Sequence, residues 1–86
     1  MLRIYADFNC IDVNDRVLLH TVGSLEDLRN IQDRGEEILE GMRVILYMTA
    51  EFEVQATLVF EKIWMGIPDW STIHYLTPDD TPTRDI

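Results

Sequence analysis

Apolar and polar residues alternate one by one along separate segments of this chain, and this alternation constrains the fold more than any other feature. Residues 2–10 place apolar side chains at even positions and mainly polar ones at odd positions. Residues 54–60 and 63–67 also carry an aliphatic or other apolar residue at every second position. A period of two is typical of half-buried β-strands, because successive side chains point to opposite faces of a strand. The chain is therefore predicted to be mainly β.

Three further segments are expected to be extended. Residues 16–22 and 43–49 are rich in β-branched and apolar residues, and the nearly continuous apolar run of 43–49 is typical of a strand covered on both faces. Pro68 has no amide proton for a sheet ladder, so it interrupts the strand before it. Extended structure is expected to resume over residues 71–76.

Asn14 and Asp15 predict a tight turn between the first two strands. Both side chains tolerate left-handed backbone, which such turns require. A two-residue turn would join residues 2–10 and 16–22 in an antiparallel hairpin. In that register Cys10 faces Leu19, and both side chains enter the core.

One short helix is expected in the middle of the chain. Apolar residues recur there at intervals of three, the spacing of one helix face: Leu25, Leu28 and Ile31. Ser24 is predicted to cap the helix N-terminus, and Gly35 is predicted to end the helix. Residues 36–42 leave two alternatives open: a further helical turn, or a loop that carries its aliphatic residues inward.

Five to six short strands and one short helix in 86 residues predict a small, highly curved sheet. The preferred architecture is an SH3-like or related antiparallel β-barrel, because closing the sheet removes its open edges. The alternative is an α+β open antiparallel sheet with the helix on one face. Residues 1–76 are expected to form this single small domain, and residues 77–86, with two prolines, a loose C-terminal tail.

The charge and the composition exclude several classes of function. The net charge is −9, from sixteen acidic and seven basic residues that are spread along the chain. A chain this negative repels phosphate backbones, so direct nucleic-acid binding is not expected. No apolar run reaches the ~18 residues of a membrane span, Asp7 interrupts any secretory signal, and a single cysteine precludes an intrachain disulfide. We expect a cytoplasmic protein.

The sequence offers no convincing metal, cofactor or catalytic site. Cys10, His20 and His74 lack the short spacings of zinc ligands, and in the expected hairpin Cys10 and His20 point to opposite faces. Ser71 and His74 are three residues apart in an expected strand, so they too face opposite sides. No phosphate-binding glycine loop is present. The protein is therefore predicted not to be an enzyme.

The segment IWMGIPDWSTIHYL, residues 63–76, contains both tryptophans and is the candidate binding surface. If residues 63–67 turn their odd positions inward, and Ile73 and Tyr75 also face the core, the remaining side chains face outward: Trp64, Trp70 and His74. Asp69 is expected to accept a backbone hydrogen bond in an Asx turn. Tyr47 is out of phase in its own strand and is expected nearby.

The candidate partner-binding residues are therefore Tyr47, Trp64, Asp69, Trp70 and His74. Exposed aromatic residues on a small barrel are a common platform for binding peptides. The structural alternative is that both tryptophans close the ends of the barrel, with a bulge at Pro68 turning Trp70 inward. Core closure is the more common role of tryptophan in so small a domain.

Two functional hypotheses follow. The first is a non-catalytic protein-interaction module that binds another protein through these aromatic residues. The alternative is an acidic inhibitor or antitoxin-like protein that covers a basic surface of its partner. Clustered carboxylates would favour the inhibitor and an apolar groove the module. A homo-oligomer with a site between subunits is left open.

Overall fold

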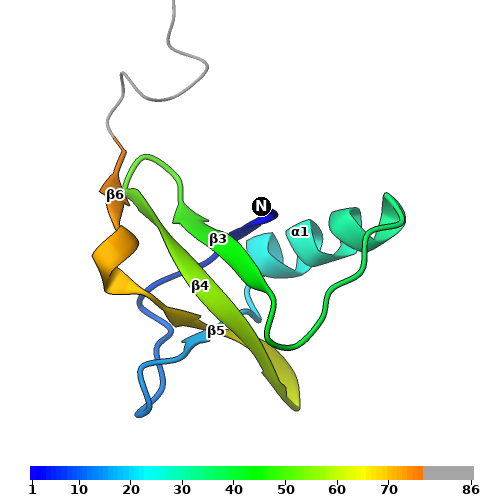
Figure 1. The fold of residues 1–86 in the computed structure, drawn as a ribbon, viewed down its shortest axis with the longest axis horizontal. Coiled ribbons are helices and arrows are strands. Elements are labelled where there is room, and N and C mark those ends of the chain that lie inside the picture. Colours follow the sequence, from blue (N-terminus) through cyan, green and yellow to red (C-terminus); the bar gives the residue numbers. More distant parts are fainter. Residues whose placement is uncertain (77–86) are drawn as a thin grey trace, which may run out of the picture.

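Within residues 1–76, six strands form one curled sheet with a single α-helix at its edge (Figure 1). The structure is a computed structural model and describes residues 1–76; the expected C-terminal tail, 77–86, lies outside the described residues. The elements are β1 (Arg3–Tyr5), β2 (Val17–Leu18), α1 (Val22–Asp33), β3 (Arg43–Met48), β4 (Phe52–Glu61), β5 (Ile63–Pro68), the 3₁₀ helix η1 (Trp70–Thr72) and β6 (His74–Tyr75).

The strand order is β1-β3-β4-β5-β2, and β6 pairs with the first residues of β4. The sheet curls into a half-barrel, which fits both a small β-barrel and an open α+β sheet, so the mainly β fold class is confirmed. No helix within residues 1–76 is long and apolar enough to cross a membrane.

The strands predicted over residues 43–49 and 54–60 are confirmed as β3 and β4, and the alternation predicted for the second holds as far as Leu58, since Phe60 is exposed. Their even-numbered residues pair across the sheet, with Val44 opposite Ala56 and Leu46 opposite Val54. These side chains are fully or almost fully buried. They belong to a core completed by Ile4, Ala6, Val17, Leu19, Leu28, Ile31 and Leu58. The tight turn between β4 and β5 falls at Lys62, whose φ is 69°.

The expected hairpin between residues 2–10 and 16–22 is wrong. Strand β1 instead pairs in parallel with β3, and β2 pairs antiparallel with β5. The two segments meet beyond β1, where Ile11 bridges Val17 and the Leu18 N–H donates to the Cys10 carbonyl at 2.8 Å. A two-residue turn would have placed Ile11 opposite Leu18, so the register is shifted by one residue.

The shift arises because residues 12–16 form a longer turn around the side chain of Asp12. Its carboxylate accepts hydrogen bonds from the backbone N–H groups of Asn14 and Arg16 and pairs with the Arg16 guanidinium. These hydrogen bonds lower the pKa of Asp12, although partial desolvation opposes them. Asp15 adopts the expected left-handed conformation at φ 61°. Cys10, expected in the core, is only half-buried.

The N-cap of helix α1 lies three residues before the predicted cap, Ser24. Thr21 is the N-cap, and its hydroxyl accepts the Ser24 N–H at 3.2 Å. Leu28 and Ile31 are buried as predicted, whereas Leu25 is exposed. The helix ends before Gly35, whose φ of +83° favours glycine.

Ser24, expected to be the cap, instead joins α1 to the edge of the sheet. Its buried hydroxyl donates to the carbonyl oxygen of Tyr5, and the carboxylate of Asp27 accepts the Tyr5 N–H at 2.8 Å. The N–H and the carbonyl group of Tyr5 point away from β3, because the neighbouring residues make the backbone hydrogen bonds that join this segment to β3. The helix therefore provides hydrogen-bond partners for backbone groups of an edge strand, which could otherwise pair with another chain.

Residues 36–42, which could have been helix or loop, form a loop. Ile38 packs against the core, while Leu39 is 54% exposed. Gly41 allows the loop to turn at φ +89°, and its N–H donates to the carbonyl of Leu58 at 2.7 Å. The loop therefore enters β3 already hydrogen-bonded to β4.

Replacing Ser24 by alanine tests the junction between helix and edge strand. Ser24→Ala leaves the Tyr5 carbonyl without its partner, and we expect a loss of about 1–3 kcal/mol in the free energy of unfolding. The control is Thr49→Ala, which removes an exposed hydroxyl that makes no side-chain hydrogen bond within residues 1–76, and the expected loss is below about 0.5 kcal/mol. Urea unfolding followed by circular dichroism measures both. Equal losses would contradict a special role for Ser24.

Candidate protein-binding site

Four aromatic side chains gather where β4 begins, and we call them the aromatic patch: Phe8, Phe52, Trp70 and Tyr75. The ring centroids of Phe8 and Phe52 are 4.7 Å apart, and Trp70 lies 5.8 Å from Phe8 and 6.1 Å from Phe52. Tyr75 meets Phe52 edge to face at 6.1 Å. The two phenylalanines are half-buried, whereas Trp70 is 45% and Tyr75 67% exposed. The patch is thus an ordered aromatic surface with a partly buried base.

The patch joins segments that are far apart in the chain. Phe8 follows β1 and packs against the core. Phe52 opens β4 and pairs with Tyr75 of β6, while Trp70 opens η1. Aromatic pairs at such distances and tilts contribute about 0.5–1.5 kcal/mol beyond the area they bury. The rings therefore hold one another in place before any partner arrives.

Asp69 positions Trp70 through the Asx turn that the sequence predicts. Its carboxylate accepts hydrogen bonds from the N–H of Ser71 at 3.2 Å and from the hydroxyl of Ser71 at 2.6 Å. Arg43 lies 3.1 Å from the same carboxylate. The hydrogen bond from the Ser71 hydroxyl, with help from Arg43, lowers the pKa of Asp69. Asp69 is thus engaged inside its own turn and serves the patch by fixing η1.

η1 replaces the first two residues of the extended segment expected over 71–76, and within that segment only β6 is a strand. The Thr72 hydroxyl donates to the Asp69 carbonyl and accepts the Gln55 N–H at 2.8 Å, so the 3₁₀ turn stays bound to β4. Ile73 packs against the core as expected. Tyr75, also expected inward, is exposed, and its ring lies against that of its β4 partner Phe52.

Trp64 does not face outward as the alternation predicted. It packs against the core, and its ring lies 5.0 Å from that of Phe60. Gly66 marks the face of β5 that packs against the core, because a Cβ added there would lie only 2.7 Å from Cδ1 of the buried Leu46. Trp64 and Gly66 therefore face this core; of the odd-numbered residues expected inward, Met65 is buried at 3% exposure, whereas Ile67 is exposed. For Trp64 the core-packing alternative describes the structure better than the outward placement.

Tyr47 binds the helix rather than the aromatic patch. Its hydroxyl donates to Asp27 at 2.9 Å, and its ring meets that of Tyr5 edge to face at 5.8 Å. The Arg3 guanidinium lies 4.9 Å from the ring centroid on the same side of the sheet. Burial, then the hydrogen bond to Asp27, raises the pKa of the Tyr47 hydroxyl. Tyr47 therefore helps to attach α1 to the sheet.

His74 is exposed and adjoins a polar pair next to the patch. Its Nδ1 lies 3.5 Å from Glu53, which accepts a hydrogen bond from Arg3 at 2.6 Å through its other oxygen. Partial burial acts to raise the pKa of Glu53, but the hydrogen bond and charge of Arg3 outweigh it, so the pKa lies below its ordinary value. His74, the first residue of β6, thus contacts the Arg3–Glu53 pair.

The five predicted binding residues do not form one surface. Trp70 lies in the patch, Asp69 supports it and His74 is next to Tyr75, whereas Trp64 and Tyr47 pack elsewhere. The alternation assigned two of the missed members, Phe8 and Tyr75, to the core, and the third, Phe52, lay outside every predicted strand. The aromatic side chains of the first and last predicted strands were the only signal for Phe8 and Tyr75, and no signal pointed to Phe52.

Within residues 1–76 no group of three or more histidine, cysteine, aspartate or glutamate side chains could hold a metal ion. Comparison of the chain with protein-family models, with curated proteins and with solved structures finds no match. The site is therefore interpreted from its own geometry.

The Arg3–Glu53 pair should make the free energy of unfolding depend on pH in the acid range. Glu53→Gln removes the charge, and we expect it to lower the free energy of unfolding by about 1 kcal/mol near pH 7. Because folding lowers the pKa of Glu53, this difference should be complete above the unfolded value of about 4.3 and vanish as the pH falls through the folded pKa. Urea unfolding from about pH 7 to pH 3 measures the difference.

The control for this series is Glu26→Gln, an exposed glutamate on α1 with no ion-pair partner among residues 1–76. Its effect on stability should be small at every pH. A Glu53→Gln loss that persists unchanged to the acid end of the series would show that the charge of Glu53 is not its cause.

Proposed function

We propose that this protein is a non-catalytic protein-interaction module that binds another protein through the aromatic patch. The observation that carries the proposal is the exposure of Trp70 and Tyr75 on a base of stacked phenylalanine rings. Tryptophan and tyrosine are enriched among the residues that dominate binding energy in protein interfaces. Rings that are already held in place lose little conformational freedom on binding, which favours affinity.

The proposed module resembles SH3-like domains in its mode of action. Such domains bind extended, proline-rich segments in grooves lined by aromatic residues. The small curled sheet and the aromatic rings at its end support this mode by analogy of architecture. The proposed place of action is the cytoplasm, where the single half-buried cysteine needs no disulfide partner.

Replacing Trp70 by alanine should abolish partner binding and leave the fold intact. Trp70 is about half exposed, so we expect a loss of only about 1 kcal/mol in stability from the missing ring contacts. Tagged wild type and Trp70→Ala are compared by affinity capture from the native cell extract, after circular dichroism has shown that both are folded.

Phe60→Ala is the matched control, because Phe60 is 48% exposed and also contacts a tryptophan ring, edge to face, but outside the patch. A partner captured by wild type and Phe60→Ala but not by folded Trp70→Ala supports the proposal. Equal capture by all three would refute the patch as the binding surface. Tyr75→Ala provides a second variant if Trp70→Ala does not fold.

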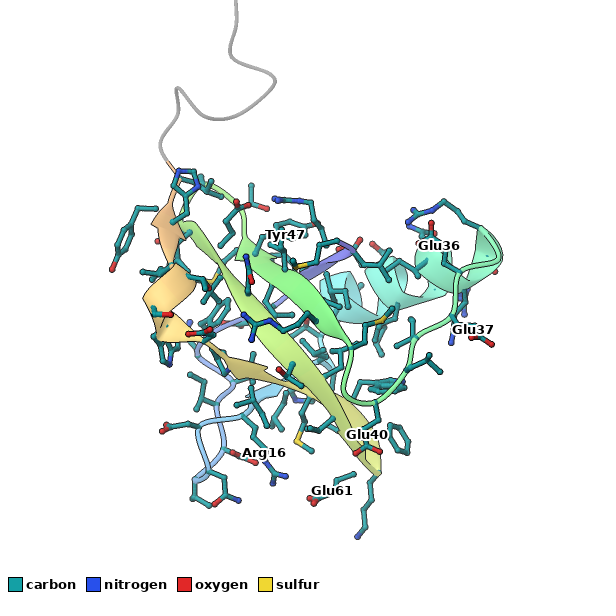
Figure 2. All side chains as sticks on the ribbon, in the orientation of Figure 1. Arg16, Glu36, Glu37, Glu40, Tyr47 and Glu61 are labelled. Carbon is teal, nitrogen blue, oxygen red and sulfur yellow. The ribbon has the colours of Figure 1, made fainter. Side chains whose placement is uncertain are left out.

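One observation favours the second candidate function, an acidic inhibitor or antitoxin-like protein. Four exposed acidic residues follow one another along the end of α1 and the next loop: Asp33, Glu36, Glu37 and Glu40. Figure 2 shows the three glutamates spread along this loop. Binding through these charges would weaken steeply between low and physiological salt, whereas binding through the aromatic patch would not.

A further inference from the structure

A broad hollow lies between the loop after α1 and the first residues of the chain. Its volume is about 690 Å³, within the range of sites that bind ligands. The apolar lining consists of Met1, Leu2, Leu39 and Met42. Glu36, Glu37 and Arg43 complete the wall, and we call the whole the acidic groove. The aromatic patch shares no residue with it.

The floor of the groove is anchored and its rim is exposed. Leu2 and Met42 pack against the core, and Leu58 donates its N–H to the Met42 carbonyl at 2.9 Å. Leu39 and Met1 are 54% and 68% exposed. Methionine and leucine surfaces adapt to apolar side chains of different shapes, because the thioether side chain is flexible and polarisable. The groove is therefore suited to several apolar anchors at once.

The charge available at the rim is negative. Arg43 lines the groove, but its guanidinium is held by Gln55 at 2.9 Å and Asp69 at 3.1 Å. Glu37 makes no ion pair within residues 1–76, and Glu36 lies 3.7 Å from Arg34, a loose exposed contact. Glu40 follows on the same loop (Figure 2). A cation that entered the groove would meet carboxylates with few competing partners.

We propose that the acidic groove binds a basic amphipathic helix of a partner protein. Such a helix places apolar anchors at i, i+3, i+4 and i+7 into a groove while its lysine and arginine residues reach the rim. Charge complementarity argues against a second copy of this chain, because two chains of net charge −9 repel each other. The inference does not rest on the aromatic patch.

The test uses a fluorescently labelled synthetic peptide of leucine and lysine, about 14 residues or four helical turns long. Leucine occupies one helix face, and an isomer of the same composition alternates leucine and lysine. Fluorescence anisotropy gives the dissociation constants for the full chain and for two variants, Leu39→Ser and Glu37→Lys. We expect each variant to weaken binding of the helical peptide about five- to tenfold, as for side chains central to an interface.

Two control variants make the same types of substitution at exposed positions outside the acidic groove. Leu25→Ser changes a leucine of 53% exposure, and Glu26→Lys an exposed glutamate, both in a separate hollow on α1. These controls should change binding less than about twofold. Equal weakening by Glu37→Lys and Glu26→Lys, equal binding of the alternating isomer, or no effect of Leu39→Ser would overturn the proposal. In those cases net charge alone attracts the peptide.

Discussion

The architecture depends on how α1 occupies the open edge of β1. Two helix side chains, Ser24 and Asp27, bind the carbonyl and the N–H of Tyr5. A parallel pair such as β1 and β3 needs a long crossover between its strands, and here the crossover includes α1. The helix that makes the connection also protects the strand that requires it. A short strand can therefore end this sheet without exposing a row of free backbone groups.

This arrangement determines where the two surfaces form. Because β1 pairs with β3, the chain leaves β1 beside the start of β4, and Phe8 meets Phe52 and Trp70 there. Because α1 returns to the same edge, the loop that follows it must cross the end of the sheet to reach β3, and it carries the glutamates of the acidic groove. Both proposed surfaces thus follow from one crossover connection.

The two surfaces would bind by different physical means. The aromatic patch offers rings that are already ordered, so its binding energy should come from desolvated aromatic area and depend little on salt. The acidic groove combines flexible apolar side chains with exposed carboxylates, so charge should accelerate association and salt should weaken it. Salt dependence is therefore a property that separates the two proposals in a single protein.

The sequence by itself determined the local structure of β3 and β4, the inward stripe of Leu28 and Ile31, and the stop at Gly35, because side-chain periodicity and backbone preference act within a few residues. The tertiary structure decided the parallel pairing of β1, the inward face of β5 and the membership of the aromatic patch. These features depend on contacts between distant segments. Gly66 is an example: Leu46 comes so close that only glycine fits on the inward face at this position. Trp64, two residues earlier, lies on the same face of the strand and therefore also packs against the core.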